Sequence, residues 1–364
     1  MTKILFIIKA PEAGGAETYL YRFMRYIEGD YTVLCTGGTG GSLEEAFTTV
    51  GRLKLDLKID YLDIVAYFKL FKYLKEQQFD TICDFRGNFS GAVLWVAYFA
   101  GIKNRIAFYR ESRNKFSKSH IKSLYVQIST YLMSKYATKI LANSYDALNH
   151  FHPEWREKTE LYNVIYNGFD TNLLSNKPKK EVKESLSLPA SSFVIAHSGR
   201  YCAAKNHDML INVAIKVCEK HPNVYFVLMG RDVKEHYLDL VIKYGMQERI
   251  KFLGYRKDVL DVLRCADLFY FPSLTEGQPN ALIEAMCNDI PFVASNIESI
   301  RETTPQCAWS RLADPTDLEQ NINFIENAIA DCNNSLSRSC GEWARRTFDA
   351  NKLFHAFADE LRKE

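Results

Sequence analysis

Two glutamates eight residues apart could bind the hydroxyl groups of a sugar-like ligand. Glu276 and Glu284 lie in the segment 272–286, directly after an apolar run at 268–271 that is typical of a buried strand. A carboxylate accepts hydrogen bonds from hydroxyls, so each glutamate could hold one end of such a ligand. Taken alone, this spacing is a weak signal. The alternative is that Glu284 only keeps a helix soluble and that Glu276 only complements the helix dipole.

The residues between the two glutamates predict a phosphate cradle. They read Gly277-Gln278-Pro279-Asn280-Ala281. Gly277 permits a turn and Pro279 suits the first position of a helix, so the loop should lead directly into a helix N-terminus. The amides of Gln278, Asn280 and Ala281 would then be free to bind a phosphate.

Two cations follow another apolar run, at 193–197, which predicts a strand. Gly199 and Arg200 come directly after this strand, and Lys205 precedes the next predicted helix. Arginine offers a bidentate fork and lysine a point charge, a combination that matches a pyrophosphate. The alternative is that both side chains only solvate a loop.

A pair of glycines near the N-terminus could approach an anion. Gly14 and Gly15 follow a predicted strand at 3–8 and precede a helix that should begin near Ala16. Without Cβ atoms, their backbone amides could contact a phosphate closely. The motif is not the G-x-G-x-x-G of dinucleotide-binding proteins, and a tight strand-to-helix turn is the alternative.

Alternating strands and helices would bring these residues to the edges of sheets. The predicted strands lie at 3–8, 31–35, 52–57, 81–85, 105–108 and 139–142, and then at 193–197, 224–229, 250–252, 268–271 and 292–294. Repeated βα units predict an α/β fold with two Rossmann-like doubly wound domains. The segment 171–190 loses this pattern and predicts a linker.

We expect the domains to span residues 1–175 and 176–350, with a C-terminal helix at 351–364 that completes the first domain. Open α/β sheets bind ligands at the carboxyl ends of their strands. Two such domains should therefore face each other across a ligand cleft.

The composition excludes several classes of protein. With 364 residues, 47% hydrophobic and 25% charged, the chain suits two globular domains and is not disordered. A net charge of +2 does not suit a dedicated nucleic-acid binder. Nine scattered cysteines without a C-x-x-C pair predict neither a disulfide framework nor a zinc site. The apolar stretches are too short for a signal peptide or a membrane-spanning helix, so we expect a cytoplasmic protein.

Four motifs together resemble the retaining GT-B glycosyltransferases of family GT4. They are the Glu276 to Glu284 segment, Gly199-Arg200 with Lys205-Asn206, Gly14-Gly15-Ala16-Glu17 and Asn167-Gly168-Phe169-Asp170. The resemblance implies a nucleotide-sugar donor held mainly by the second domain, retention of anomeric configuration and no required metal. In agreement with the last point, no two aspartates in the sequence are separated by a single residue, so the D-x-D metal motif of the other common transferase architecture is missing.

The resemblance also implies a role for each site residue. Arg200 and Lys205 would bind the diphosphate, and Glu284 would bind the ribose. Glu276 would bind hydroxyls of the transferred sugar. Glu276, Arg200 and Lys205 would be the catalytic residues. The complete donor-binding set comprises Gly14, Gly15, Gly199, Arg200, Lys205, Gly254, Gly277, Gln278, Pro279, Asn280, Ala281 and Glu284. Gly15 would lie toward the phosphates, and Gly254 in the loop beside the base.

The sequence departs from the family after the predicted fifth strand of the first domain. Many relatives have a histidine there, whereas this chain has Arg110, Glu111 and Arg113, and its next histidine is His120. We name Arg110, Glu111 and Arg113 as candidates for contact with the sugar or the acceptor.

The segment 103–122 concentrates positive charge. It contains seven Lys and Arg residues and one Glu, interleaved with aromatic residues that continue to Tyr125. This pattern predicts contact with an anionic membrane surface, through Lys115, Lys118 and Lys122. A solvated loop and helix face is the alternative.

We therefore expect a metal-independent, retaining glycosyltransferase of surface polysaccharide assembly. It would move a sugar from a nucleotide-sugar donor, with a UDP-sugar favoured, to a glycan or a lipid-linked saccharide acceptor. We expect no cofactor and no nucleic-acid partner, and the inner face of the membrane is a candidate location within the cytoplasm. The competing interpretations are a GT-B sugar-nucleotide epimerase or phosphorylase and a non-catalytic nucleotide-sugar binding module.

Overall fold

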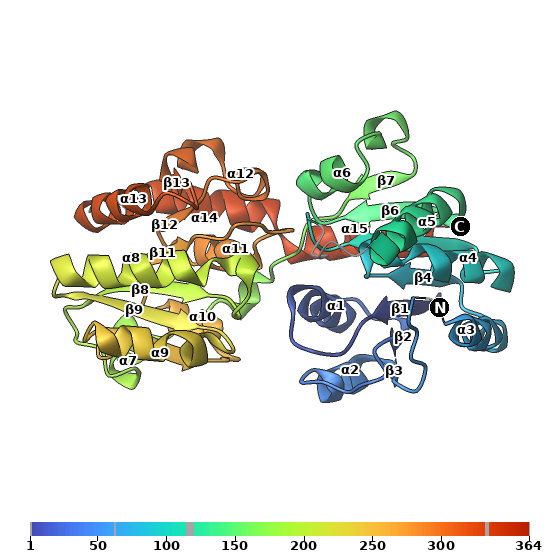
Figure 1. Cartoon of the computed structure of the whole chain (residues 1–364), viewed down its shortest axis with the longest axis horizontal. Coiled ribbons are helices and arrows are strands. Elements are labelled where there is room, and N and C mark those ends of the chain that lie inside the picture. The colour runs from blue at the N-terminus through green and yellow to red at the C-terminus, as the bar shows by residue number, and fades with distance from the viewer. Residues whose placement is uncertain (1, 62, 114–119, 332–334, 364) are drawn as a thin grey trace. The chain divides into compact units, whose positions relative to one another are not determined.

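The computed structural model divides the chain into two units and describes residues 2–61, 63–113, 120–331 and 335–363. Unit 1 comprises Met1–Gly168 and Ala350–Glu364, and unit 2 comprises Phe169–Asp349. Each unit is a parallel sheet with helices on both faces (Figure 1). The predicted class of two doubly wound α/β domains is confirmed.

The sheet of unit 1 has seven strands in the order β3-β2-β1-β4-β5-β6-β7. The strands are β1 (Lys3–Ile8), β2 (Asp30–Cys35), β3 (Arg52–Lys54), β4 (Thr81–Asp84), β5 (Asn104–Tyr109), β6 (Lys139–Ala142) and β7 (Tyr162–Val164). The helices are α1 (Gly15–Tyr26), α2 (Glu44–Val50), α3 (Ile64–Gln77), η1 (Gly87–Phe89), α4 (Gly91–Ala100), α5 (His120–Tyr136), α6 (Tyr145–Phe151), η2 (Trp155–Glu157) and α15 (Ala350–Arg362). The sequence analysis missed β7, and β3 is shorter than the predicted range 52–57.

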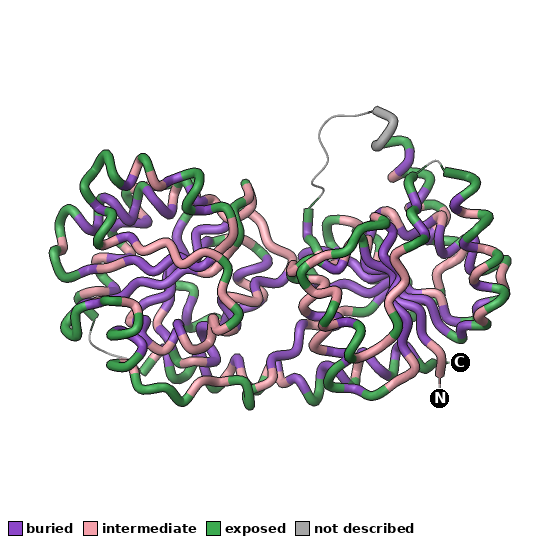
Figure 2. The backbone as a smooth tube through the Cα atoms, turned by 90° about the horizontal axis from the view of Figure 1, so that it is seen from below, coloured by how far each residue is buried: buried purple, intermediate pink, exposed green. Residues whose placement is uncertain are grey.

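Side chains of β1 alternate between two cores, because successive residues of a strand point to opposite faces of the sheet. Ile4, Phe6 and Ile8 pack with α1 and α15 on one face. Leu5 and Ile7 pack with α3 and α4 on the other face. Burial on both faces explains why the strand is apolar from Ile4 to Ile8. Figure 2 shows such buried strands at the centre of each unit.

Helix α15 belongs to unit 1, although all of unit 2 separates it from the rest of that unit in the sequence. Phe357 and Leu361 are fully buried in the core that α1 also covers. The ring centroid of Phe357 lies 4.7 Å from that of Phe23. Thr81 Oγ1 donates a hydrogen bond to the carbonyl of Leu361 at 2.7 Å, which joins the end of the helix to β4.

The sheet of unit 2 has six strands in the order β10-β9-β8-β11-β12-β13. The strands are β8 (Phe193–Ser198), β9 (Val224–Met229), β10 (Ile250–Gly254), β11 (Leu268–Phe271), β12 (Phe292–Ser295) and β13 (Leu312–Ala313). The helices are η3 (Thr171–Leu173), α7 (Lys179–Ser185), η4 (Ala203–Lys205), α8 (His207–Lys220), α9 (Val233–Lys243), α10 (Val259–Leu263), α11 (Asn280–Cys287), α12 (Glu298–Thr303), η5 (Gln306–Arg311), α13 (Leu318–Ala330) and α14 (Ser335–Thr347). Strand β8 pairs with both β9 and β11, so the loops after these three strands share one edge of the sheet.

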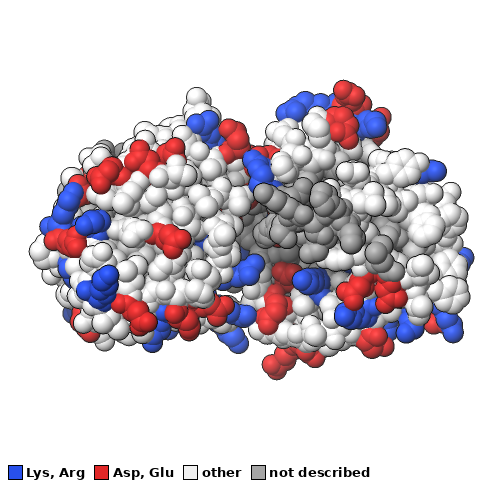
Figure 3. Space-filling view, viewed as in Figure 1, with Lys and Arg blue, Asp and Glu red and all other residues white. Residues whose placement is uncertain are grey.

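The surface carries both signs of charge. On the face that Figure 3 shows, acidic and basic side chains are intermixed over unit 2, as the nearly balanced charge of the chain leads one to expect. Among the helices that the structure describes, none combines the length and the apolar character needed to cross a membrane.

Candidate active site

Lys205 and Glu276 meet at the carboxyl edge of the unit 2 sheet. Lys205 Nζ donates a hydrogen bond to Glu276 Oε1 at 2.8 Å. The side chains are only 19% and 11% exposed, so water screens this ion pair less than a surface pair. Lys205 ends η4 after β8, and Glu276 follows β11. The adjacency of β8 and β11 therefore brings together two predicted site residues that are far apart in the sequence.

Asn206 fixes the loop that carries Lys205. Its backbone is left-handed, with a φ of 54°, a conformation that asparagine tolerates better than most residues. Its side-chain Nδ2 donates to the carbonyl oxygens of Pro272 at 3.0 Å and Pro315 at 2.9 Å. The amide of Leu274 also donates to the carbonyl of Ala204 at 2.8 Å. These bonds hold the loops after β8 and β11 against each other.

Gly199 lies where three segments approach closely. A Cβ atom there would lie 3.0 Å from His197 Nε2 and 3.1 Å from Lys205 Cδ. A Cβ on neighbouring Gly230 would lie only 2.0 Å from the carbonyl oxygen of Gly199. Arg200 is exposed, and its guanidinium forms no ion pair with any residue that the structure describes. Arg200 therefore remains available for an anionic ligand.

Two buried histidines lie beneath this loop, and the sequence analysis missed them as parts of the site. His197 Nδ1 bonds to the carbonyl of Tyr270 at 2.9 Å, and His207 Nε2 to the carbonyl of Gly199 at 3.3 Å. Burial lowers the pKa of His197 to about 3 and that of His207 to about 4. Both rings are therefore neutral at neutral pH, and the positive charge of the site comes from Lys205 and Arg200.

The loop between the two glutamates differs in one respect from the prediction. Helix α11 begins at Asn280, with Pro279 as its N-cap. The backbone amide of Asn280 donates to the carbonyl of Gln278 at 3.0 Å. The prediction that this amide is free for a phosphate is therefore wrong, because a tight turn already uses it. The amide of Ala281 stays a candidate, buried Gln278 stays a predicted donor-binding residue, and partly exposed Glu284 lies within α11.

Gly254 ends β10 at the same edge of the sheet. Its φ of +63° is left-handed, which favours glycine, and its carbonyl accepts a hydrogen bond from the amide of Gly230 at 2.8 Å. Next to it, the exposed ring of Tyr255 lies 4.5 Å from the guanidinium carbon of Arg231. This pair offers a flat surface on which an aromatic base could stack. The sequence analysis missed Arg231, although its position just after β9 places it at this edge.

In unit 1, Gly14 and Gly15 differ in their surroundings. Gly14 is the N-cap of α1, and a Cβ there would lie 2.7 Å from Glu17 Oε2. A Cβ on Gly15, the first residue of α1, would meet no atom within 4 Å. The loop itself is held by Ser42 Oγ, which accepts a hydrogen bond from the amide of Ala13 at 3.1 Å. Gly15 therefore borders open space, as a ligand-facing residue would.

Arg110 is partly buried and packs against aromatic rings at the end of β5. Its guanidinium carbon lies 3.9 Å from the ring centroid of Tyr19 and 4.8 Å from that of Phe108. Burial lowers the pKa of Arg110 to about 10, so it is still a cation at neutral pH. Its Nε and Nη1 are buried without a hydrogen-bond partner among the described residues. An anionic ligand would compensate such a buried cation.

The neighbouring candidates have different environments. Both Nη atoms of Arg113 donate to the Asp146 carboxylate at 3.1 Å, so its charge is already neutralised. Glu111 is exposed.

Among the described residues of segment 103–122, several basic side chains make contacts within the chain. Arg110 and Arg113 make the internal contacts given above, and Arg105 Nε donates to the carbonyl of Tyr136 at 2.6 Å. The interleaved aromatic residues Phe108, Tyr109 and Tyr125 are buried, because they face the core rather than solvent. Lys115, Phe116 and Lys118 lie outside the described residues, and Lys122 lies in the first turn of α5.

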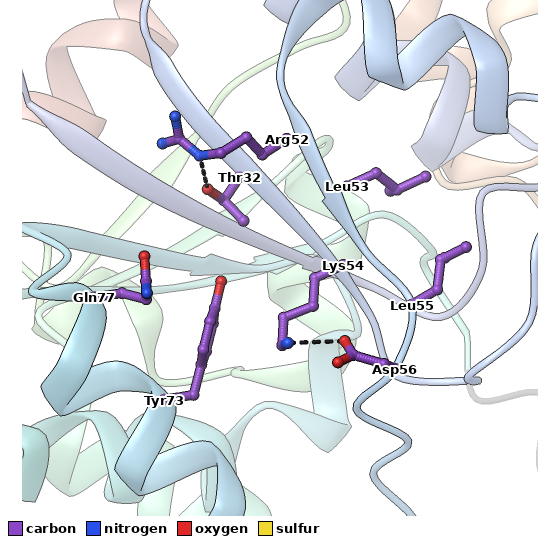
Figure 4. Close-up of a pocket in the computed structure, with 8 residues that line it drawn as sticks. All are labelled: Thr32, Arg52, Leu53, Lys54, Leu55, Asp56, Tyr73 and Gln77. Atoms are coloured by element: carbon purple, nitrogen blue, oxygen red, sulfur yellow. Dashed lines mark hydrogen bonds and ion pairs between the residues drawn. The ribbon is translucent and has the colours of Figure 1, made fainter.

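A pocket of about 490 Å³ lies beside the edge strand β3 of unit 1 (Figure 4). It is lined by Thr32, Arg52, Leu53, Lys54, Leu55, Asp56, Tyr73 and Gln77. Arg52 forms an ion pair with Asp30, and Lys54 with Asp56. The two basic residues that line the pocket are therefore already paired. None of the predicted site residues lines this pocket.

Two family models match most of the chain between them. Residues 13–173 match the model described as Glycosyltransferase Family 4, and residues 192–331 match the model described as Glycosyl transferases group 1. The matched regions contain the glycine loop of unit 1 and the Lys205 and Glu276 loops of unit 2, respectively.

Among similar proteins is the capsular polysaccharide biosynthesis glycosyltransferase CapH of Staphylococcus aureus, 28% identical over 313 residues, which are 83% of each chain. Another is the UDP-Gal:alpha-D-GlcNAc-diphosphoundecaprenol alpha-1,3-galactosyltransferase of Escherichia coli, 29% identical over 49% of this chain and 48% of that protein. The crystal structure of Anabaena HepE in complex with UDP and glucose aligns over 99% of both chains, with a TM-score of 0.83 and 22% identity. The predicted family resemblance is confirmed, and the chain belongs to the family 4 glycosyltransferases of GT-B fold.

Proposed function

We propose that this glycosyltransferase moves a sugar from a nucleotide-sugar donor to a saccharide acceptor in polysaccharide assembly. The 2.8 Å ion pair between Lys205 and Glu276 carries this proposal. It holds a cation and a hydroxyl-binding carboxylate side by side, and in a nucleotide sugar the diphosphate and the sugar are likewise adjacent. The names of CapH and of the Escherichia coli galactosyltransferase support a role in polysaccharide assembly.

In the proposed mechanism, Lys205 and Arg200 stabilise the departing nucleoside diphosphate. Negative charge develops on the diphosphate as the bond to the anomeric carbon breaks, and prepositioned cations lower the energy of that state. A lysine ammonium has three donors, so Lys205 can keep its bond to Glu276 while it donates to a phosphate. Glu276 would accept hydrogen bonds from sugar hydroxyls, and Glu284 from the ribose.

The finer assignments are a UDP-sugar donor, retention of configuration and a glycan or lipid-linked acceptor. HepE was crystallised with UDP and glucose, which supports a uridine nucleotide. The Escherichia coli relative is named for a diphosphoundecaprenol acceptor, which supports a lipid-linked saccharide. Arg110, with its two unpaired buried nitrogens, is our candidate in unit 1 for contact with the sugar or the acceptor.

A donor screen followed by product analysis tests this function. The purified chain is heated with UDP-, GDP- and ADP-sugars, because a ligand at 100 times its Kd stabilises a protein by about 2.7 kcal/mol. The stabilising donor is then incubated with saccharide acceptors, and the anomeric configuration of the product is determined by NMR. Release of a sugar phosphate or an epimerised nucleotide sugar would contradict transfer, and binding without turnover would indicate a binding module.

We expect transfer to continue in EDTA, because Arg200 and Lys205 supply the positive charge that a divalent cation supplies in other transferases. The initial rate should be the same in EDTA and in added Mg²⁺ or Mn²⁺. A rate that is lost in EDTA and restored by either cation would contradict this assignment.

A further inference from the structure

Three neighbouring helices of unit 1 expose large apolar side chains to solvent. Helices α3, α4 and α5 each contribute two prominent ones, namely Ile64 and Phe68, Trp95 and Phe99, and Ile128 and Tyr131. Ile64 is 81% exposed and Phe68 is 70% exposed. Soluble monomers rarely leave large contiguous apolar surfaces uncovered. We call this surface the α3–α5 face.

The α3–α5 face is continuous because α4 packs against both α3 and α5. The inner sides of the three helices share one core, to which Leu70, Val93 and Met133 contribute. The outer sides are connected by aromatic contacts. The ring centroid of Phe99 lies 5.7 Å from that of Trp95 and 6.3 Å from that of Tyr136 in α5.

Helix α4 shows most clearly that packing inside unit 1 does not account for these residues. Its sequence, GAVLWVAYFA, contains no charged residue and is apolar on every side. A helix of this kind is normally surrounded by other apolar groups. Val93 and Ala97 are fully buried against the sheet, whereas Trp95, Tyr98 and Phe99 are exposed. The exposed side of α4 is therefore suited to an apolar environment outside unit 1.

The charged side chains of the three helices are mostly positive, although Asp63 caps the start of α3 and Lys72 pairs with Glu76. The three helices contain five lysines and one acidic residue, Glu76. Lys69, Lys72, Lys75 and Lys135 are exposed. In Figure 3, the surface over α4 lacks charged side chains, and basic side chains lie near α3. Aromatic side chains bordered by lysines are typical of surfaces that bind anionic membranes.

We propose that the α3–α5 face docks on the surface of an anionic lipid bilayer. The apolar side chains enter the boundary between headgroups and acyl chains, and the lysines bind the lipid phosphates. This arrangement differs from the interpretation of segment 103–122, because it uses side chains of three helices in place of one cationic loop. The inference is independent of the sugar-transfer chemistry, and only its link to a lipid-linked acceptor depends on the proposed function.

Vesicle flotation with two matched variants tests the proposal. The wild-type chain should float with phosphatidylglycerol-containing vesicles at low salt and much less with pure phosphatidylcholine vesicles. The variant Phe68→Ser/Phe99→Ser/Tyr131→Ser should bind the anionic vesicles at least about tenfold more weakly, because each change removes apolar area that enters the bilayer. The control Ile242→Ser/Tyr244→Ser/Trp309→Ser removes three exposed apolar side chains from unit 2 and should bind like the wild type. Equal binding of both variants would overturn the proposal.

Circular dichroism shows whether the triple variant is folded. If it is not, the fluorescence of Trp95 provides a second test of the docking proposal. Lipids with brominated acyl chains should quench part of the wild-type fluorescence, and Trp95→Phe should abolish that quenching. Persistent quenching in Trp95→Phe, or none in the wild type, would overturn the proposal. A dimer in sedimentation velocity that the triple variant abolishes would show that a second copy covers the face instead.

A soluble acceptor separates this inference from the proposed function. With a short-chain acceptor in the absence of vesicles, the folded triple variant should keep the wild-type kcat. A variant that loses vesicle binding and keeps this activity supports the docking surface. Loss of this activity in the folded variant would overturn the assignment of the face to docking alone.

Discussion

At the residue scale, Lys205 and Glu276 depend on each other before any ligand binds. Both side chains are largely buried, so removal of either one leaves a charge that water solvates poorly. The pair also keeps the carboxylate of Glu276 in place at the carboxyl edge of the unit 2 sheet. We therefore expect a single substitution to change both the binding of a donor and the stability of unit 2.

We expect Glu276→Gln and Lys205→Ala each to lower kcat/KM by two to three decades, because loss of one transition-state contact costs on the order of 3 kcal/mol. The double variant should be hardly slower than either single variant, since the two residues act as a unit. Initial rates at several donor concentrations measure this coupling. Glu248→Gln, which alters an exposed ion pair with Lys251, is the matched control and should stay at the wild-type rate. Independent, additive losses would argue against a shared role.

The buried histidines give unit 2 a sensitivity to acid. In the unfolded chain a histidine takes up a proton below about pH 6.5, whereas in the folded chain burial lowers the pKa of His207 to about 4. The unfolded state therefore binds more protons between these values. The contribution of His207 to stability is complete above about pH 6.5 and falls as the pH decreases toward 4.

We expect the thermal midpoint of the chain to fall as the pH decreases from 7 to 5, and to fall less steeply in His207→Gln. The glutamine can still donate a hydrogen bond toward Gly199 but does not titrate. Differential scanning calorimetry in buffers of equal ionic strength measures both slopes. Parallel slopes for the wild type and the variant would show that His207 does not contribute to the acid sensitivity.

At the element scale, the site depends on how closely neighbouring loops approach. Gly230 follows β9, and a methyl group there would overlap the carbonyl of Gly199 at 2.0 Å. Because the contacting atoms belong to the backbone, only a backbone shift can relieve the overlap, and such a shift lowers stability. The backbone of Gly199 and Arg200 would therefore have to shift.

We therefore expect Gly230→Ala to destabilise unit 2 and to weaken donor binding by at least about tenfold, or about 1.4 kcal/mol. Isothermal titration with the donor and thermal unfolding measure the two effects. Gly15→Ala is the matched control for the unfolding measurement alone, because its methyl group meets no atom within 4 Å and alanine favours a helix. It should leave stability unchanged or slightly raised. Wild-type donor affinity in Gly230→Ala would contradict the importance of this approach.

The sequence predicts the long strands well, because a parallel strand that is buried on both faces must be apolar along its whole length. β7 and β13, with three and two residues, are too short to produce a recognisable pattern. The meeting of Lys205 and Glu276 was predictable, because each follows a strand and such loops share one edge of a parallel sheet. The hydrogen bond of the Asn280 amide and the packing of Arg110 against aromatic rings could not be predicted, because both depend on local three-dimensional geometry.

At the scale of the whole molecule, the two units differ in how the chain builds them. Unit 2 is one continuous segment, whereas unit 1 consists of two segments that flank it. Helix α15 contributes fully buried side chains, including Phe357 and Leu361, to the core of unit 1. Without α15, that core would expose the aromatic side chains that pack against it.

We expect a fragment of residues 169–349 to fold alone and to bind the donor nucleotide measurably. A fragment of residues 2–168 should be soluble and cooperative only when residues 350–364 are supplied, either through a short linker or as a separate peptide. Phe357→Ala should cost about 3–5 kcal/mol of unit 1 stability, because it leaves a large cavity. Chemical denaturation of each fragment measures these differences. Equal stability of residues 2–168 with and without the helix would contradict this division of the core.

The position of α15 near the end of the sequence also delays completion of the unit 1 core during synthesis on the ribosome. After Gly168, residues 169–349 must be polymerised before the first residue of α15 exists, which takes on the order of 20 s at roughly 10 residues per second. During this interval the nascent first half of the chain has its strands but lacks the helix that covers Phe6 and Phe23. Unit 1 therefore cannot complete its core until α15 has been made, although most of this unit is translated first. Until α15 has been made, we expect the first half of the chain to expose aromatic surface and to be prone to aggregation.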